Sequence, residues 1–161
     1  MKSIRPQTAM EKFYMKFDLP PKPDDEIPTI PSYLEELSDA KLMELYGQYM
    51  AWMSYAKAEL VQAEIAEERV ANDLKVTESE VLIGQWGAST KGDTVTLAKA
   101  RRDVDPEVVK YQNKHLEARA YRKLVDSVFE RCERGAQLLS RELSRRISIA
   151  PQERRQSRYN P

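Results

Sequence analysis

The fold is decided by residues 42–60, "LMELYGQYMAWMSYAKAEL". Large apolar side chains recur there every three or four residues, the spacing that places them on one face of an α-helix. The spacing continues beyond this stretch, and no proline interrupts residues 32–105. The positions on this face are Leu42, Leu45, Tyr49, Trp52, Ala56, Leu60, Ala63, Val70 and Leu74. The pattern predicts a long amphipathic helix over about residues 39–84.

A second apolar stripe follows "DPE" at residues 105–107. Aspartate is a strong N-cap, proline suits the first helical position, and glutamate complements the positive end of the helix dipole. The stripe comprises Val108, Tyr111, His115, Ala118, Val125, Val128, Cys132, Ala136, Leu139 and Leu143. This pattern predicts a helix over about residues 106–149, which we expect to end before Pro151.

Two such helices would bury one stripe each against the other. A further apolar set, on the second helix, is left for other chains to cover. Its members are Leu116, Leu124, Phe129 and Leu138. We therefore expect an all-α fold, a long antiparallel helical hairpin that assembles into a homo-oligomer through coiled-coil-like seams.

Outside these helices the composition changes. Residues 1–31 form a predicted extended arm, because "DLPPKPDDEIPTIP" holds five prolines in 14 residues. The arm is either a flexible tail or a peptide that docks on a neighbouring subunit or partner. A helical domain is expected at 32–150, with a basic connector at 88–105, and a basic flexible tail at 151–161.

Two residues near the arm are candidate helix caps. Ser32 and Glu35 match the capping-box pattern "SYLE", and Ser38 offers a second N-cap before the first long helix. Ordered structure is therefore expected to begin at Ser32.

Charge is distributed unevenly along a chain whose formal net charge is zero. Residues 1–98 carry 10 Lys/Arg and 17 Asp/Glu, whereas residues 99–161 carry 16 and 9. The split indicates an acidic half and a basic half with different partners, or subunits that attract each other head to tail. With one cysteine and no signal-peptide or membrane-spanning run, the chain is expected to be cytoplasmic, with no membrane partner.

Catalytic patterns are missing from the sequence. The single histidine, His115, and the single cysteine, Cys132, both fall on the apolar stripe and are expected to be core residues. They are too few for a zinc site, and "GQWGASTKGD" lacks the spacing of a phosphate loop. We expect no enzyme, no metal and no cofactor.

Basic residues supply the main candidate site. Lys99, Arg101 and Arg102 precede the N-terminus of the second helix, where backbone N–H groups favour anions. Neighbouring Asp103, Asp105 and Glu107 offer the equally weighted alternative of a self-neutralised loop. Five more cations follow on the helix: Lys110, Lys114, Arg119, Arg122 and Lys123.

Tyr111 and Tyr121 interleave with these cations. Cations that track phosphates and rings that stack on bases are typical of single-stranded DNA binders. The alternative, which we favour for the tyrosines, is that they lie in the helix seam.

The segments "LYGQYMAWMSYAKAELVQAEIAEERVANDLK" and "TLAKARRDVDPEVVKYQNKHLEARAYRKLVDSVFERCERGAQLLSRELSRR" resemble the UvsY family of phage recombination mediators. The resemblance implies a helical ring-forming oligomer that binds single-stranded DNA and loads a RecA-like recombinase onto strands coated by single-strand-binding protein. It implies no cofactor and no catalysis. At the place of the family's basic stretch, "EERVANDLK", only Arg69 and Lys75 are cationic.

Two hypotheses follow. The first is a non-enzymatic recombination mediator in the host cytoplasm of a phage. The alternative is a helical structural or assembly protein of a phage particle, an adaptor or scaffold with no nucleic-acid role, in which the two charged halves meet across subunit contacts.

Overall fold

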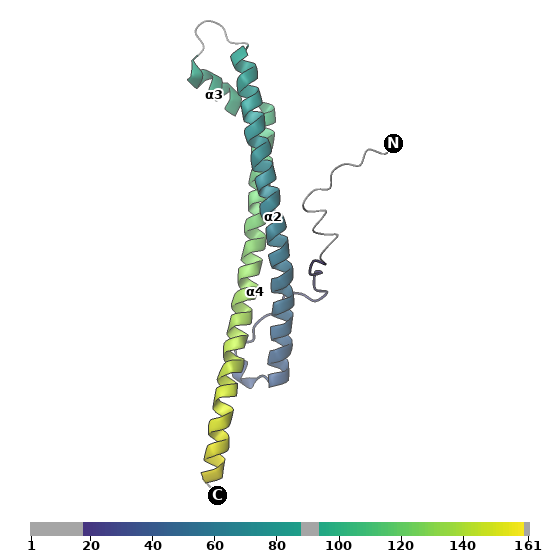
Figure 1. Ribbon diagram of the computed structural model, residues 1–161, viewed down its shortest axis with the longest axis vertical. Helices are drawn as coiled ribbons and strands as arrows, with labels where there is room; N and C mark the ends of the chain where they lie inside the picture. Colours follow the sequence, from purple (N-terminus) through teal and green to yellow (C-terminus); the bar gives the residue numbers. More distant parts are fainter. Residues whose placement is uncertain (1–17, 88–93, 160–161) are drawn as a thin grey trace, which may run out of the picture. The chain divides into compact units, whose positions relative to one another are not determined.

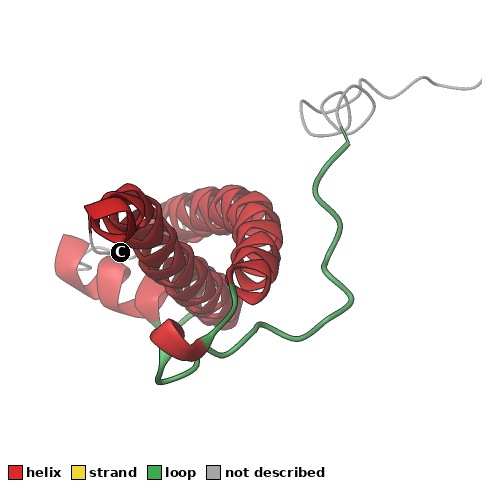
Figure 2. Cartoon of the chain, turned by 90° about the horizontal axis from the view of Figure 1, so that it is seen from below, coloured by secondary structure: helices red, strands yellow, loops and turns green. Residues whose placement is uncertain are grey.

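A computed structural model describes residues 18–87 and 94–159, with side chains through residues 85 and 149 in the two ranges. Within these ranges the chain holds helices and loops but no strand (Figures 1 and 2). The elements are η1 (Leu34–Glu36), a short 3-10 helix, and the α-helices α2 (Asp39–Gly87), α3 (Val95–Asp103) and α4 (Pro106–Tyr159). The prediction of an all-α fold is confirmed.

Two of the predicted caps begin the two long helices. The Ser38 hydroxyl accepts a hydrogen bond from the Lys41 backbone N–H at 3.2 Å, one turn into α2. At α4, Asp105 Oδ1 accepts from the Glu107 N–H at 2.9 Å. Each cap satisfies an N–H group that has no partner inside its helix.

The capping box predicted at Ser32 is wrong. η1 begins after Tyr33, and no side chain caps its N-terminus. The contacts that hold this short helix come instead from a residue more than 100 positions away, Arg146, described below.

Two predicted boundaries are also wrong. The connector predicted at 88–105 contains a helix, α3, and α4 continues through Pro151 to Tyr159 where a flexible tail was predicted. Pro151 cannot donate a hydrogen bond to the carbonyl of Ile147, but Ile147 is 73% exposed, so water can replace the lost donor. Residues 1–17 of the predicted arm, 88–93 of the connector and 160–161 of the tail lie outside the described residues.

The chain divides into two compact units, and α2 and α4 contribute to both. The described part of the first unit comprises residues 18–58 and 128–159. Within it the two helices run antiparallel, since Asp39 contacts Arg146 and Tyr49 lies against Gly135. Its buried core consists of Leu42, Leu45, Tyr49, Trp52, Cys132, Ala136 and Leu139, which confirms the predicted stripe over this region.

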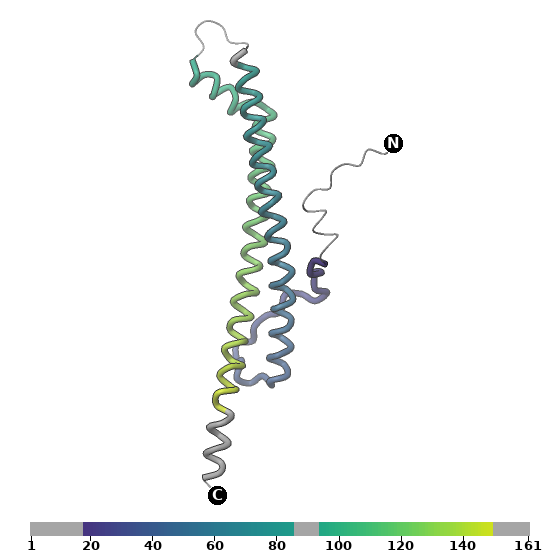
Figure 3. Tube along the Cα trace, in the orientation of Figure 1, coloured from purple at the N-terminus to yellow at the C-terminus, as the bar shows by residue number. Residues whose placement is uncertain are grey.

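Part of the proline-rich segment before η1 packs on this core, and Figure 3 traces the path of its backbone. Ile27 and Ile30 contact the buried cluster, and the Tyr49 hydroxyl donates to the Pro28 carbonyl oxygen at 2.5 Å. Burial raises the pKa of Tyr49, so its hydroxyl stays protonated as a donor. A tyrosine from the helix stripe therefore fixes the last part of the arm.

Arg146 joins η1, α2 and α4 in the first unit. Its guanidinium donates to the carbonyl oxygens of Leu34 at 2.8 Å and Leu37 at 2.7 Å, and to the Asp39 carboxylate at 2.7 Å. On α4 it also donates to Glu142 at 2.8 Å. Five donors in one rigid plane let a single arginine satisfy acceptors in all three elements.

The described part of the second unit comprises residues 59–85 and 94–127 with their side chains. Its buried residues are Leu60, Ala63, Ala98 and Val108. Here too α2 and α4 run antiparallel, because Glu59 contacts Tyr121 and Glu67 contacts His115. Of the predicted stripe, only Leu60, Ala63 and Val108 are buried in this unit. Its other members here are half-buried: Val70, Leu74, Tyr111, His115, Ala118 and Val125.

Gly135 and Gly47 provide a matched pair of helical substitutions. A Cβ at Gly135 would lie 2.5 Å from the Tyr49 ring, whereas nothing lies within 4 Å of one at Gly47. Tyr49 is buried and held at its hydroxyl, so the ring cannot move away at low cost. We expect G135A to lower the free energy of unfolding by about 1–3 kcal/mol. G47A should raise it by about 0.5–1 kcal/mol, since alanine is the better helix former.

Urea unfolding followed by circular dichroism measures both changes. Equal effects at the two glycines would contradict the contact between Tyr49 and Gly135.

Glu142 makes the stability of the first unit pH-dependent. Hydrogen bonds from Arg145 and Arg146 lower the pKa of its carboxyl from 4.5 to about 2. Because the folded pKa lies below the unfolded one, the stabilisation is complete above about pH 5 and is lost as pH falls toward 2. We therefore expect E142Q to unfold at lower temperature than wild type at pH 6, and the two melting temperatures to converge near pH 2.

The control is E133Q, on an acidic residue of α4 that has no ion pair with another described residue. Its melting temperature should follow the wild-type pH profile. A constant difference between E142Q and wild type from pH 6 to pH 2 would contradict the assignment.

Candidate nucleic-acid interface

All ten predicted DNA-binding residues lie in the second unit. Three are on α3, five on α4 and two on α2. They are Lys99, Arg101, Arg102, Lys110, Lys114, Arg119, Arg122, Lys123, Arg69 and Lys75. The structure therefore brings the candidates into one unit, and the directions of their side chains decide which of them share a surface.

The cations of the predicted connector lie on α3, a helix that was not predicted. The Thr94 hydroxyl caps this helix, accepting from the Leu97 N–H at 3.4 Å, and only Ala98 is buried. Only one of its nine residues is buried, so α3 rests on few apolar contacts. The sequence did hold signals for this helix: Thr94 is a residue type that favours N-caps, and residues 97–102 are all strong helix formers.

The position of Arg101 and Arg102 on α3 gives a structural reason for two basic residues at this point of the sequence. Arg101 and Arg102 occupy the last turn of α3, where positive charge complements the helix dipole. Arg102 also donates to Asp103 Oδ1 from Nε at 2.8 Å and Nη2 at 2.6 Å, and this bond raises its pKa. Arg101 and Arg102 therefore end one helix as well as precede another.

The N-terminus of α4 is already occupied. The Asp105 carboxylate takes the Glu107 N–H, and the Asp105 N–H itself donates to the Arg102 carbonyl at 3.0 Å. A carboxylate on the helix end satisfies the positive dipole that an outside anion would use. The connection between α3 and α4 therefore fits the self-neutralised loop better than it fits an anion site on backbone N–H groups.

Arg122 points into the seam and not to solvent. It lies seven residues after His115 on the stripe of α4 and hydrogen-bonds the Glu67 carboxylate of α2. His115 Nε2 lies 3.8 Å from the other oxygen of Glu67. The three side chains are 18–28% exposed, so they form a polar layer between the helices. His115 belongs to this layer and is not the apolar-core residue that was expected.

The remaining α4 cations divide between two flanks of the helix. At about 100° per residue, Lys110 and Lys114 lie on one side of the seam, and Arg119 and Lys123 lie on the other. Lys110 pairs with Glu107 at 3.1 Å. Arg119 and Lys123 form no hydrogen bond or ion pair with another described residue.

Lys99 on α3, and Arg69 and Lys75 on α2, are likewise exposed and form no ion pair with another described residue. Arg69 and Lys75 fall on different sides of α2, because they are six residues apart.

The two tyrosines lie on or beside the Lys110 flank. The Lys114 ammonium is 4.8 Å from the centre of the half-buried Tyr111 ring, a cation–π contact. Tyr121 lies seven residues after Lys114, is 50% exposed, and donates its hydroxyl to Glu59 at 2.6 Å. Tyr111 thus fits the alternative that the tyrosines lie between the helices, whereas half of the Tyr121 surface is exposed to solvent.

The described residues hold no group of three or more His, Cys, Asp or Glu side chains that could bind a metal. Cys132 is fully buried, as expected, and burial raises the pKa of its thiol. None of the described helices is long and apolar enough to cross a membrane.

Comparison with known protein families, with characterised protein sequences and with solved structures finds no match to this chain.

Arg122 and Arg119 separate a structural role from a surface role. R122A leaves the Glu67 carboxylate in the seam without its main partner, and we expect the free energy of unfolding to fall by about 1–3 kcal/mol. R119A removes a cation that has no described partner and should change stability by less than about 0.5 kcal/mol.

Chemical denaturation of the two variants in parallel measures this. If R122A is as stable as wild type, Arg122 has no structural role between the helices and is a surface cation.

Proposed function

We propose that this protein is a non-enzymatic recombination mediator that binds single-stranded DNA and helps to load a RecA-like recombinase. The observation that carries the DNA-binding part is the flank of α4 that holds Lys110 and Lys114 and, about two turns further along, Tyr121, which is 50% exposed. Cations four residues apart can track a phosphate backbone, and the ring offers a surface on which a base can stack. Exposed Lys99 on α3 adds a further cation in the same unit.

Recombinase loading and homo-oligomer formation rest on the resemblance of the two long segments to the UvsY family. The exposure of Leu116 at 60%, Leu124 at 67% and Leu138 at 43% favours an assembly in which other copies cover α4.

The second candidate is a helical structural or assembly protein without a nucleic-acid role. One observation favours it: several cations that looked available in the sequence are engaged within the chain. Arg122 is bound to Glu67, Arg102 to Asp103 and Lys110 to Glu107. Such a protein assembles without DNA and has no preference for single strands.

Fluorescence anisotropy with a labelled dT oligonucleotide tests the proposal, with a duplex of equal length for comparison. K110A/K114A should weaken binding about tenfold or more and reduce the slope of log K against log salt by about 1.4, because two phosphate contacts are lost. The matched control, R119A/K123A, removes the same charge from the opposite flank and should retain most of the affinity.

Equal losses in the two variants would show a diffuse electrostatic attraction and contradict the assigned flank. No binding by wild type at low salt, or equal binding of the duplex, would favour the structural protein.

A further inference from the structure

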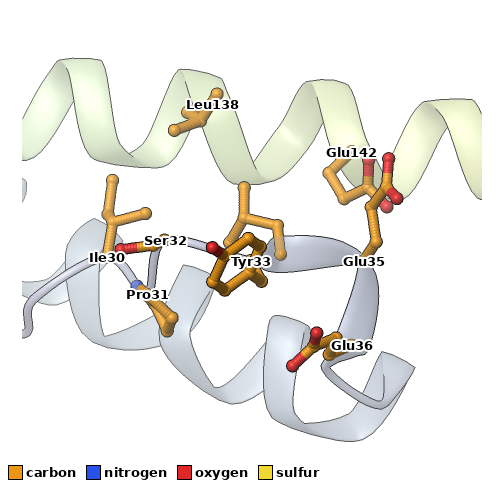
Figure 4. Close-up of a pocket in the computed structure, with 9 residues that line it drawn as sticks. Ile30, Pro31, Ser32, Tyr33, Glu35, Glu36, Leu138 and Glu142 are labelled. Atoms are coloured by element: carbon orange, nitrogen blue, oxygen red, sulfur yellow. The ribbon is translucent and has the colours of Figure 1, made fainter.

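An open groove with both polar and apolar lining residues lies beside η1 in the first unit (Figure 4). Its volume is about 500 Å³. Ile30 of the arm and Leu138 of α4 line it from facing sides, and Tyr33 contributes a ring that is 71% exposed. The groove therefore presents apolar surface to solvent.

Acidic side chains border this apolar surface. Glu35 and Glu36 both line the groove and are exposed. Glu36 has no ion pair with another described residue, and the Glu35 carboxylate pairs with Arg145 at the long distance of 4.0 Å. The third carboxylate, Glu142, is engaged by Arg145 and Arg146. Two carboxylates thus remain to attract a positively charged occupant.

The first 17 residues of the chain have the complementary chemistry. They contain four Lys/Arg and one Glu, whereas residues 18–40 contain one Lys and seven Asp/Glu. Lys12 and Lys16 alternate with three aromatic side chains in "KFYMKF", residues 12–17. Apolar rings between cations match a groove of apolar residues bordered by glutamates.

The path of the arm favours the groove of a different copy. Pro28 is held by Tyr49, and Lys22 to Thr29 pass a second pocket at Trp52 and Arg131. Pro20, Pro21 and Pro23 favour extended backbone over residues 19–23, which opposes a tight turn there toward residues 30–36 of the same chain.

We propose that residues 1–17 of one copy bind the groove formed by Ile30, Tyr33, Glu35, Glu36 and Leu138 of a second copy. The contact joins subunits of the homo-oligomer proposed above. It does not involve the DNA-binding flank, so it is measured without nucleic acid and can fail or succeed independently of DNA binding.

Charge reversal in the full-length protein tests the contact by sedimentation equilibrium. K12E/K16E reverses the segment, and E35K/E36K reverses the groove. Each variant alone should associate at least about tenfold more weakly than wild type, because like charges then face each other. An equimolar mixture places each segment opposite a groove of opposite charge and should regain complexes heavier than either variant forms alone.

The control is E64K/E68K, which makes the same charge change on exposed residues of α2 in the second unit and should associate as wild type does. Circular dichroism confirms equal helix content in all variants. Monomeric wild type, unchanged association of the two reversed variants, or a mixture that forms no heavier complex would each overturn the proposal. The last result would place the segment on the groove of its own chain.

Discussion

Burial of the α2 and α4 stripes against each other is the constraint on which the rest of each unit depends. In the first unit the stripe is apolar and admits large side chains such as Trp52 and Tyr49, which contact both α4 and the arm. In the second unit the same stripe carries Glu67, His115 and Arg122. A charged pair between helices contributes little net free energy compared with apolar residues, but it penalises any register that separates the two charges.

The same constraint pairs some of the charges that are unevenly distributed along the sequence. Antiparallel packing brings acidic α2 against basic α4, so Glu67 meets Arg122 and Asp39 meets Arg146. Some of the opposite charges in this chain of zero net charge therefore pair with each other between α2 and α4. The surface left for other molecules is therefore smaller than the count of cations in the sequence indicates.

Helix starts and buried faces were predictable because they depend on neighbours within one or two turns. Ser38 and Asp105 cap their helices through bonds to residues two or three positions away. The helix of residues 95–103 was missed, although residues 97–102 are strong helix formers, because it is short and buries only Ala98. The candidate site was only partly predictable: helical spacing places Lys110 and Arg119 on opposite flanks, but it does not reveal that Arg122 binds Glu67, a residue 55 positions away in the sequence.

The sequence by itself determined that the described chain is helical, where its long helices begin and which face of each is buried. These properties follow from spacing along a single helix and from the chemistry of a cap. Tertiary structure decided that Arg146 holds η1 and that Tyr49 requires a glycine at position 135. It also decided which cations remain exposed. Each of these depends on a residue many positions away in the sequence, and only the packing of one helix against another determines which residue that is.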